Sequence, residues 1–138
     1  LAAEFARLAD YLALMAIRMG PRLEVALELP PELAELPVPP LILQPLVENA
    51  IQHGLEPQVA GGRITVSAAR QGDALQLTVA DTGAGFDAAH ARPNRFGMAQ
   101  VTERMRSAYG DRGGVDVQSA PGQGTTVRLT LPLEKGGA

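Results

Sequence analysis

The sequence has no cysteine and no tryptophan, and it contains only two histidines and one lysine. The lack of cysteine excludes a disulfide scaffold, a thiolate zinc site and a cysteine nucleophile. His53 and His90 alone are too few for a multi-histidine metal site. The single lysine, Lys135, is followed by glycine, whereas a Walker A phosphate loop needs Gly-Lys-Ser or Gly-Lys-Thr. A Walker A phosphate loop is therefore excluded.

Long apolar runs are absent as well, and none approaches the roughly 18 residues of a membrane span. The opening also lacks the basic-then-apolar pattern of a signal peptide. The 138 residues are 46% hydrophobic and 20% charged, which is typical of one soluble globular domain. The net charge of −3 disfavours nucleic acid as a partner. The positive charge gathers in residues 92–112, which indicates a local anion site or simply a solvated helix face.

Apolar periodicity divides the chain into helices and strands. Helical spacing is expected over 1–19, 41–53 and 98–109. Alternation predicts strands over 23–29, 64–70, 75–81, 115–119 and 126–133. The second and third strands, and the last two, are joined by turn residues and read as hairpins. The order predicts an α+β fold of two layers, with helices on one face of a mixed sheet.

The first helix carries an apolar seam spaced by alternating steps of four and three residues. Its members are Leu1, Phe5, Leu8, Leu12, Met15 and Met19. A seam this narrow is typical of helices that pair with one another. A helix packed on its own domain is the alternative. We favour a dimerisation helix here, because the seam is narrow and begins at the first residue.

The second helix has an apolar stripe and a crowded polar side. The polar side chains are Gln44, Glu48, Asn49, Gln52 and His53. An amide oxygen such as that of Asn49 is a hard ligand suited to Mg²⁺, which takes few protein ligands beside phosphate oxygens and water. An ordinary amphipathic helix would show the same polar face.

A carboxylate and flexible glycines follow the strand that ends at Asp81. The stretch Gly83 to Ala88 matches the dinucleotide pattern G-x-G-x-x-A, but no βαβ unit surrounds it, so that reading is rejected. The carboxylate of Asp81 could accept a hydrogen bond from an exocyclic amine such as adenine N6, and glycines let the backbone approach a flat ring. A tight turn is the alternative. Residues 122–125 alone indicate a hairpin turn.

Taken together and in order, these pieces resemble the ATP-binding domain of sensor histidine kinases, within the superfamily that holds gyrase, Hsp90 and MutL. The stretch LILQPLVENAIQHGL resembles the N box of LytS-type kinases. DTGAGF, FGMAQVTERMRSAYG and GQGTTVRLTLP resemble the three glycine-rich boxes that follow it. The resemblance covers nearly the whole chain. It implies a Bergerat-type α/β sandwich with a sheet of about five strands, and the alternation independently predicts five.

The resemblance also implies roles for individual residues. Asn49 would ligate a Mg²⁺ ion that bridges the ATP phosphates, and His53 would lie beside the nucleotide. Asp81 would accept from adenine N6. The remaining nucleotide-binding positions lie in loops and glycine-rich turns: Gly83 and Gly85 in the adenine pocket, Arg95 and Gly97 in a lid over the phosphates, and Gly124 and Thr125 closing the base pocket.

Several positions depart from the family pattern, and one such stretch is Met98-Ala99-Gln100, where the subfamily usually has asparagine. Gln52 stands where many members have lysine, and Arg95 stands where the second glycine-rich box usually has its first glycine. Gyrase-like relatives place a hydrolytic glutamate four residues before the Mg²⁺ asparagine, and this chain has Pro45 there. We therefore expect ATP binding without efficient activation of water.

The resemblance implies a Mg-ATP-binding kinase domain over residues 21–138, preceded by the end of an upstream dimerisation helix over residues 1–20. It would present the γ-phosphoryl of ATP to a histidine outside this chain. Partners would be the acceptor helix of the same protein, a response regulator of the LytTR type and a second copy in the full-length homodimer. The domain would be cytoplasmic and contact no membrane, with the full-length protein anchored in the inner membrane. The alternative is a degenerate, non-catalytic signalling module with weak or no nucleotide binding.

Overall fold

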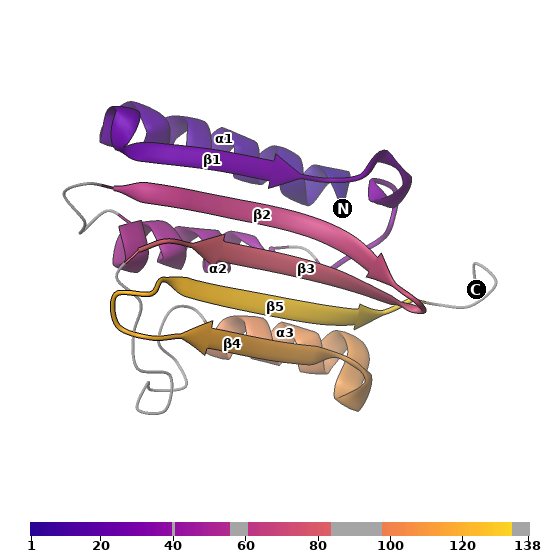
Figure 1. Ribbon diagram of the computed structural model, residues 1–138. Coiled ribbons are helices and arrows are strands. Elements are labelled where there is room, and N and C mark those ends of the chain that lie inside the picture. The colour runs from indigo at the N-terminus through magenta and orange to yellow at the C-terminus, as the bar shows by residue number, and fades with distance from the viewer. Residues whose placement is uncertain (40, 56–60, 84–97, 134–138) are drawn as a thin grey trace.

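A five-stranded mixed sheet forms one layer of the structure. The structure is a computed structural model that describes residues 1–39, 41–55, 61–83 and 98–133. The strands are β1 (Leu23–Glu28), β2 (Gly62–Gln71), β3 (Ala74–Asp81), β4 (Gly114–Ser119) and β5 (Thr125–Pro132). They lie in the order β1-β2-β3-β5-β4, and β1 pairs with β2 in parallel while the other pairs are antiparallel. Figure 1 shows this order across the sheet.

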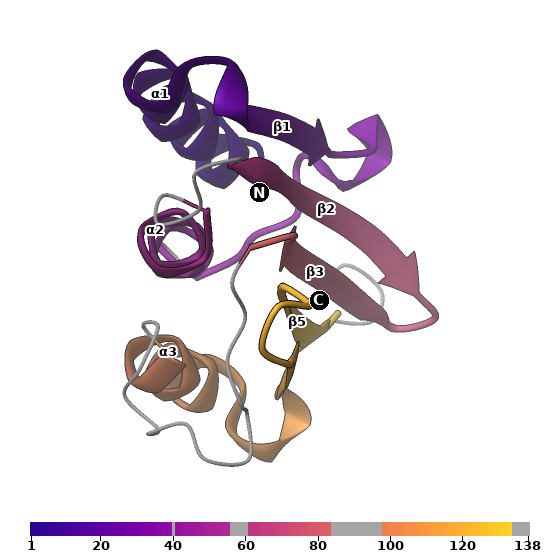
Figure 2. The same cartoon turned by 60° about the vertical axis from the view of Figure 1, so that its left-hand side comes forward.

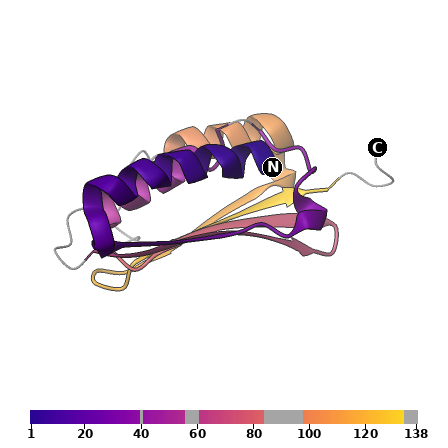
Figure 3. The same cartoon turned by 90° about the horizontal axis from the view of Figure 1, so that it is seen from above.

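The helices cover one face of the sheet and leave the other uncovered in the part of the chain that the structure describes (Figure 3). They are α1 (Ala2–Met19), α2 (Gln44–Asn49) and α3 (Met98–Tyr109). Figure 2 shows α2 between the other two. The predicted α+β fold with helices on one face of a mixed sheet is confirmed. Within the described residues, no helix combines the length and the apolar character that crossing a membrane requires.

The second helix begins where its proline allows. Leu43 precedes the first helical residue, so Pro45 lies in the first turn. The missing N–H of a proline costs little there, because first-turn N–H groups have no partner within the helix. After Asn49 the helix widens into a π-helical segment, Ala50–Leu55, that packs against β2 and β3. Such segments are frequent at functional sites.

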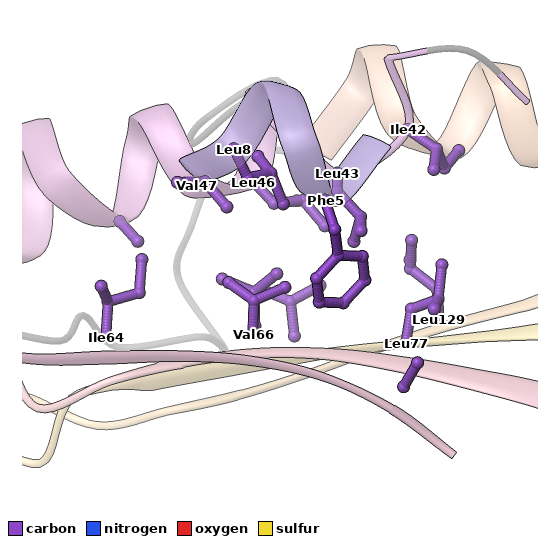
Figure 4. Close-up of a cluster of buried hydrophobic side chains, with 14 of the residues drawn as sticks. Phe5, Leu8, Ile42, Leu43, Leu46, Val47, Ile64, Val66, Leu77 and Leu129 are labelled. Carbon is purple, nitrogen blue, oxygen red and sulfur yellow. The ribbon is translucent and has the colours of Figure 1, made fainter. Parts of the chain in front are cut away.

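The core lies between the helices and the sheet, and the alternation of the strands supplies one side of it. Along β3 every second side chain from Leu75 to Asp81 is buried. Figure 4 shows Leu77 and Leu129 of the sheet facing Leu43 and Phe5 of the helical layer. The face that Leu77 shares with Asp81 is therefore the face that the helices cover.

The seam of the first helix is used inside the domain. Phe5, Leu8 and Leu12 are 6%, 0% and 2% exposed and belong to the core. The prediction that this seam pairs with another chain is wrong for the described structure, because the sheet and α2 already cover these side chains. The heptad-like spacing was correct about which face is buried and wrong about its partner. Whether residues 1–20 end a longer upstream helix stays a prediction.

Truncation of Leu8 tests this packing. The variant Leu8→Ala is expected to lose about 2–5 kcal/mol of unfolding free energy, because it leaves a cavity in the core. Ile17→Ala on the same helix is the control, since Ile17 is 81% exposed and surface substitutions stay within about 0.5 kcal/mol. Urea unfolding measures both. Equal losses in the two variants would contradict the assignment of the seam to this core.

Candidate functional site

A carboxylate ends the central strand of the sheet on its covered face. Asp81 is the last residue of β3 and is 8% exposed. It continues the inward series of Leu75, Leu77 and Val79. In the register of the sheet it lies between Ile64 of β2 and Thr125 of β5. Period-two alternation thus places a charged group where the pattern calls for an apolar side chain.

Backbone donors hold this carboxylate in place. The N–H of Gly83 donates to Oδ1 of Asp81 over 2.8 Å, an aspartate turn that fixes the chain as it leaves the strand. The backbone N–H of Thr125 also donates to the carboxylate. Burial raises the pKa of Asp81 above its ordinary value, and these two hydrogen bonds act in the opposite direction. The result is a buried, oriented hydrogen-bond acceptor.

Gly124 allows β5 to approach the end of β3 closely. Its φ is +78°, and a Cβ at this position would lie 2.1 Å from the carbonyl oxygen of Asp81. The turn before it is tied by Ser119, whose hydroxyl donates to the Gly124 carbonyl over 3.0 Å and lies 2.8 Å from the Thr125 hydroxyl. Gly124 is therefore required by backbone contact, in addition to its turn geometry.

Thr82 and Gly62, which are not among the predicted site residues, complete this end of the sheet. The hydroxyl of Thr82 accepts a hydrogen bond from the backbone N–H of Arg63 over 2.9 Å, and the N–H of Thr82 donates to the Arg63 carbonyl over 3.1 Å. A Cβ on Gly62 would lie 2.5 Å from the Thr82 hydroxyl and 2.7 Å from Leu55. The start of β2 thus packs directly against Thr82, the residue that follows Asp81. In the sequence, the only sign of this close packing is the pair of glycines at 61–62.

The predicted metal ligand lies on α2, in the helical layer. Asn49 is half-buried, and its side-chain nitrogen donates to the Pro45 carbonyl over 2.7 Å. This bond orients the amide, with the nitrogen turned to the helix backbone and the oxygen as the remaining acceptor. His53 lies in the π-helical segment that follows. That segment runs toward the end of the sheet where β3 finishes (Figure 1).

The structure brings together four of the predicted nucleotide-binding residues. Asp81, Gly83, Gly124 and Thr125 meet at one end of the β3–β5 pair. The other members of the predicted set that lie in the lid and adenine loop, Gly85, Arg95 and Gly97, fall outside the described residues.

Comparison with known proteins places this arrangement in a family. Residues 40–135 match the family described as histidine kinase-, DNA gyrase B-, and HSP90-like ATPase. This match covers more than half of the chain and includes every position of the candidate site. The chain belongs to this ATPase family. The resemblance found in the sequence motifs is thereby confirmed.

Two curated relatives match nearly the whole of this chain. The sensor histidine kinase BtsS of Escherichia coli is 37% identical over 136 residues, covering 94% of this chain and 24% of BtsS. The sensor protein LytS of Oceanobacillus iheyensis is 26% identical over 94% of this chain and 24% of its own length. This chain thus spans about a quarter of these curated relatives.

The fold is that of histidine kinase catalytic domains. The blue-light activated histidine kinase of Erythrobacter litoralis EL346 superposes with a TM-score of 0.73 at 21% identity, over 95% of this chain and 42% of that one. The nucleotide-free catalytic domain of histidine kinase ThkA superposes with a TM-score of 0.70 at 11% identity, over 96% of this chain and 91% of that one.

The contact between Gly124 and Asp81 is tested by a matched pair of alanines. Gly122 and Gly124 have φ of +76° and +78°, but a Cβ on Gly122 would meet nothing within 4 Å. Gly122→Ala is expected to lose about 1–2 kcal/mol of unfolding free energy from backbone strain. Gly124→Ala should lose about 1–3 kcal/mol more, because the strands must separate. Equal urea-unfolding losses would show that the close approach is not needed.

Proposed function

We propose that this chain is the Mg-ATP-binding catalytic domain of a sensor histidine kinase. It would hold ATP so that the γ-phosphoryl reaches an acceptor histidine outside this sequence. One observation carries the proposal. Asp81 presents a buried carboxylate at the end of β3, on the face that the helices cover, and the N–H groups of Gly83 and Thr125 orient it. Family membership and relatives named as sensor histidine kinases support it.

The residues at this end of the sheet fit an adenine ring. The carboxylate accepts hydrogen bonds and donates none when ionised, so it selects a base edge that donates, such as the exocyclic amine of adenine. Gly83 and Gly124 add no side-chain bulk beside it, which leaves room for a flat ring to approach the backbone. Because the pKa of Asp81 is raised by burial, base binding should weaken in acid as this carboxylate takes up a proton.

The phosphates would lie toward α2. The amide oxygen of Asn49 is the hard oxygen ligand that Mg²⁺ accepts, and the bond to Pro45 turns the amide nitrogen away from that role. Bound Mg²⁺ would neutralise phosphate charge, which is the main requirement of phosphoryl transfer beside positioning. Asn49 would hold the ion, and Asp81 would fix the opposite end of the nucleotide. His53 would lie beside it.

The chain is expected to bind ATP but to hydrolyse it only slowly. Pro45 has no side-chain base, and it takes the place of the hydrolytic glutamate in gyrase-like relatives. Glu48 is the neighbour of Asn49, but successive helical residues point about 100° apart. Its carboxylate instead accepts a hydrogen bond from the Gln44 side chain over 3.3 Å. A kinase fits this arrangement, because its nucleophile is a histidine rather than water.

The partners follow from the same proposal. The phosphoryl group would pass to a histidine on a helix of the full-length protein and from there to a response regulator of the LytTR type. The full-length protein would act as a homodimer. The domain would work in the cytoplasm, and the full-length protein would be anchored in the inner membrane.

Removal of the Asp81 charge should weaken nucleotide binding selectively. We expect Asp81→Asn to bind ATP about 10- to 150-fold more weakly, because a hydrogen bond to a charged group contributes about 1.5–3 kcal/mol. Isothermal titration calorimetry in Mg²⁺ measures this. Asp73→Asn is the control, since Asp73 is exposed in the turn before β3. Unchanged affinity in folded Asp81→Asn protein would remove Asp81 from the site.

Removal of the Asn49 amide should act on the metal. The wild-type chain is expected to bind ATP more tightly with Mg²⁺ than with a chelator, and Asn49→Ala should lose most of that difference. Gln118→Ala, in an exposed position of β4, should keep it. Calorimetric titrations of the three proteins with and without Mg²⁺ decide the point. An undiminished Mg²⁺ effect in Asn49→Ala would contradict the ligand assignment, and a folded wild-type chain without ATP binding would favour the non-catalytic module.

A further inference from the structure

A second buried carboxylate, that of Glu4, lies in the helical layer. Among the described residues, Glu4 and Asp81 are the buried charged side chains, at 6% and 8% exposure. Glu4 belongs to the first turn of α1, far in sequence from every motif of the candidate site. A buried carboxylate is costly unless hydrogen bonds compensate it, so its partners indicate what it holds.

Both oxygens of Glu4 accept hydrogen bonds from the segment that leads into α2. The N–H of Leu41 donates to Oε2 over 3.0 Å, and the N–H of Leu43 donates to Oε1 over 3.1 Å. Leu41 has a φ of +58°, which is unusual for a residue with a side chain. Arg7 is 4.0 Å from Oε2 but 57% exposed, so this ion pair contributes little. The backbone of the α2 entry is therefore the main partner.

These bonds connect with the proposed metal ligand. Leu43 is the N-terminal flanking residue of α2 and has no side-chain cap, so Glu4 supplies a cap from another helix. Two residues after Leu43, the Pro45 carbonyl accepts a hydrogen bond from the side-chain nitrogen of Asn49 over 2.7 Å. The path from α1 to the Asn49 amide thus runs through Glu4, one N–H group and the first turn of α2.

We propose that Glu4 is a positioning residue for the nucleotide site, which fixes the entry of α2 and through it the Asn49 amide. The proposal rests on the proposed function for its effect on Mg-ATP. With Glu4 in this role, the affinity for Mg-ATP depends on the placement of α1. Glu4 itself would touch neither nucleotide nor metal.

The variant Glu4→Gln tests the proposal because it keeps the size of the side chain. A glutamine can accept from only one of the two N–H groups and turns its own donor toward the other. We expect the Mg²⁺-dependent gain in ATP affinity to fall by about fivefold or more, the lower range of measured coupling between sites. Binding of ATP in chelator, which depends on Asp81, should be unchanged. Asp10→Asn, an exposed position of α1, is the control.

A double-mutant cycle separates positioning from general damage. If Glu4 acts through Asn49, Glu4→Gln has no further effect on the Mg²⁺ dependence in an Asn49→Ala background. Glu4→Asp provides a second variant should Glu4→Gln fail to fold, because it keeps the charge and can retain one of the two bonds. Its Mg²⁺ effect should be intermediate. Additive losses in the cycle, or a folded Glu4 variant with wild-type Mg²⁺ dependence, would overturn the proposal.

A readout without nucleotide distinguishes failure of this inference from failure of the proposed function. The side-chain NH₂ signals of Asn49 can be assigned in an NMR spectrum by their loss in Asn49→Ala. Glu4→Gln should shift them and Asp10→Asn should not, whether or not the chain binds ATP. Unmoved Asn49 signals in folded Glu4→Gln protein would overturn the positioning role.

Discussion

The carboxylate of Asp81 occupies a position of β3 that the alternation of the strand assigns to the core. The rest of the candidate site depends on how this charge is accommodated. Two backbone N–H groups, from Gly83 and Thr125, compensate part of its desolvation. The second of them is available only because β5 comes close to the end of β3, and that approach requires Gly124. The acceptor, the turn after it and the glycine of the last hairpin are thus one structural unit.

The helical layer adds a second point of attachment. Asn49 is held by its bond to Pro45, and the turn that contains Pro45 is held from α1 by Glu4. A nucleotide between Asp81 and Asn49 would therefore contact the sheet and a helix whose first turn is bonded to Glu4. Positioning of this kind is what phosphoryl transfer asks of a protein. If Glu4 positions Asn49 as proposed, α1 would affect the site without contacting the nucleotide.

Local patterns in the sequence were sufficient for most of the helices and strands, whereas the residues of the candidate site were proposed from the family resemblance. Alternation predicted the hairpin of β2 and β3, with Asp81 as the last residue of its second strand. The partner of the α1 seam was not predictable in this way, because periodicity reports which face is buried and not what buries it. The same holds for Glu4, whose partners Leu41 and Leu43 are distant in sequence.

The pairing of the strands was also beyond local patterns. The parallel pairing of β1 with β2, and the placement of β5 between β3 and β4, depend on contacts between segments far apart in the chain. The requirement for Gly124 became visible only with that placement, because the atom that a Cβ would meet belongs to β3. As a turn residue alone, Gly124 had an ordinary explanation.

The role of Asp81 in selecting adenine is tested most directly by a backbone amide NMR titration of this chain with ATP and with GTP. Guanine carries an acceptor oxygen where adenine carries its exocyclic amine, so the carboxylate of Asp81 should discriminate against it. ATP should shift the amide signals of Gly83 and Thr125, while the Gly72 amide in the far turn of the sheet should stay in place. GTP at the same concentration should have little effect. Shifts that cluster away from Asp81, or equal shifts with GTP, would contradict this role.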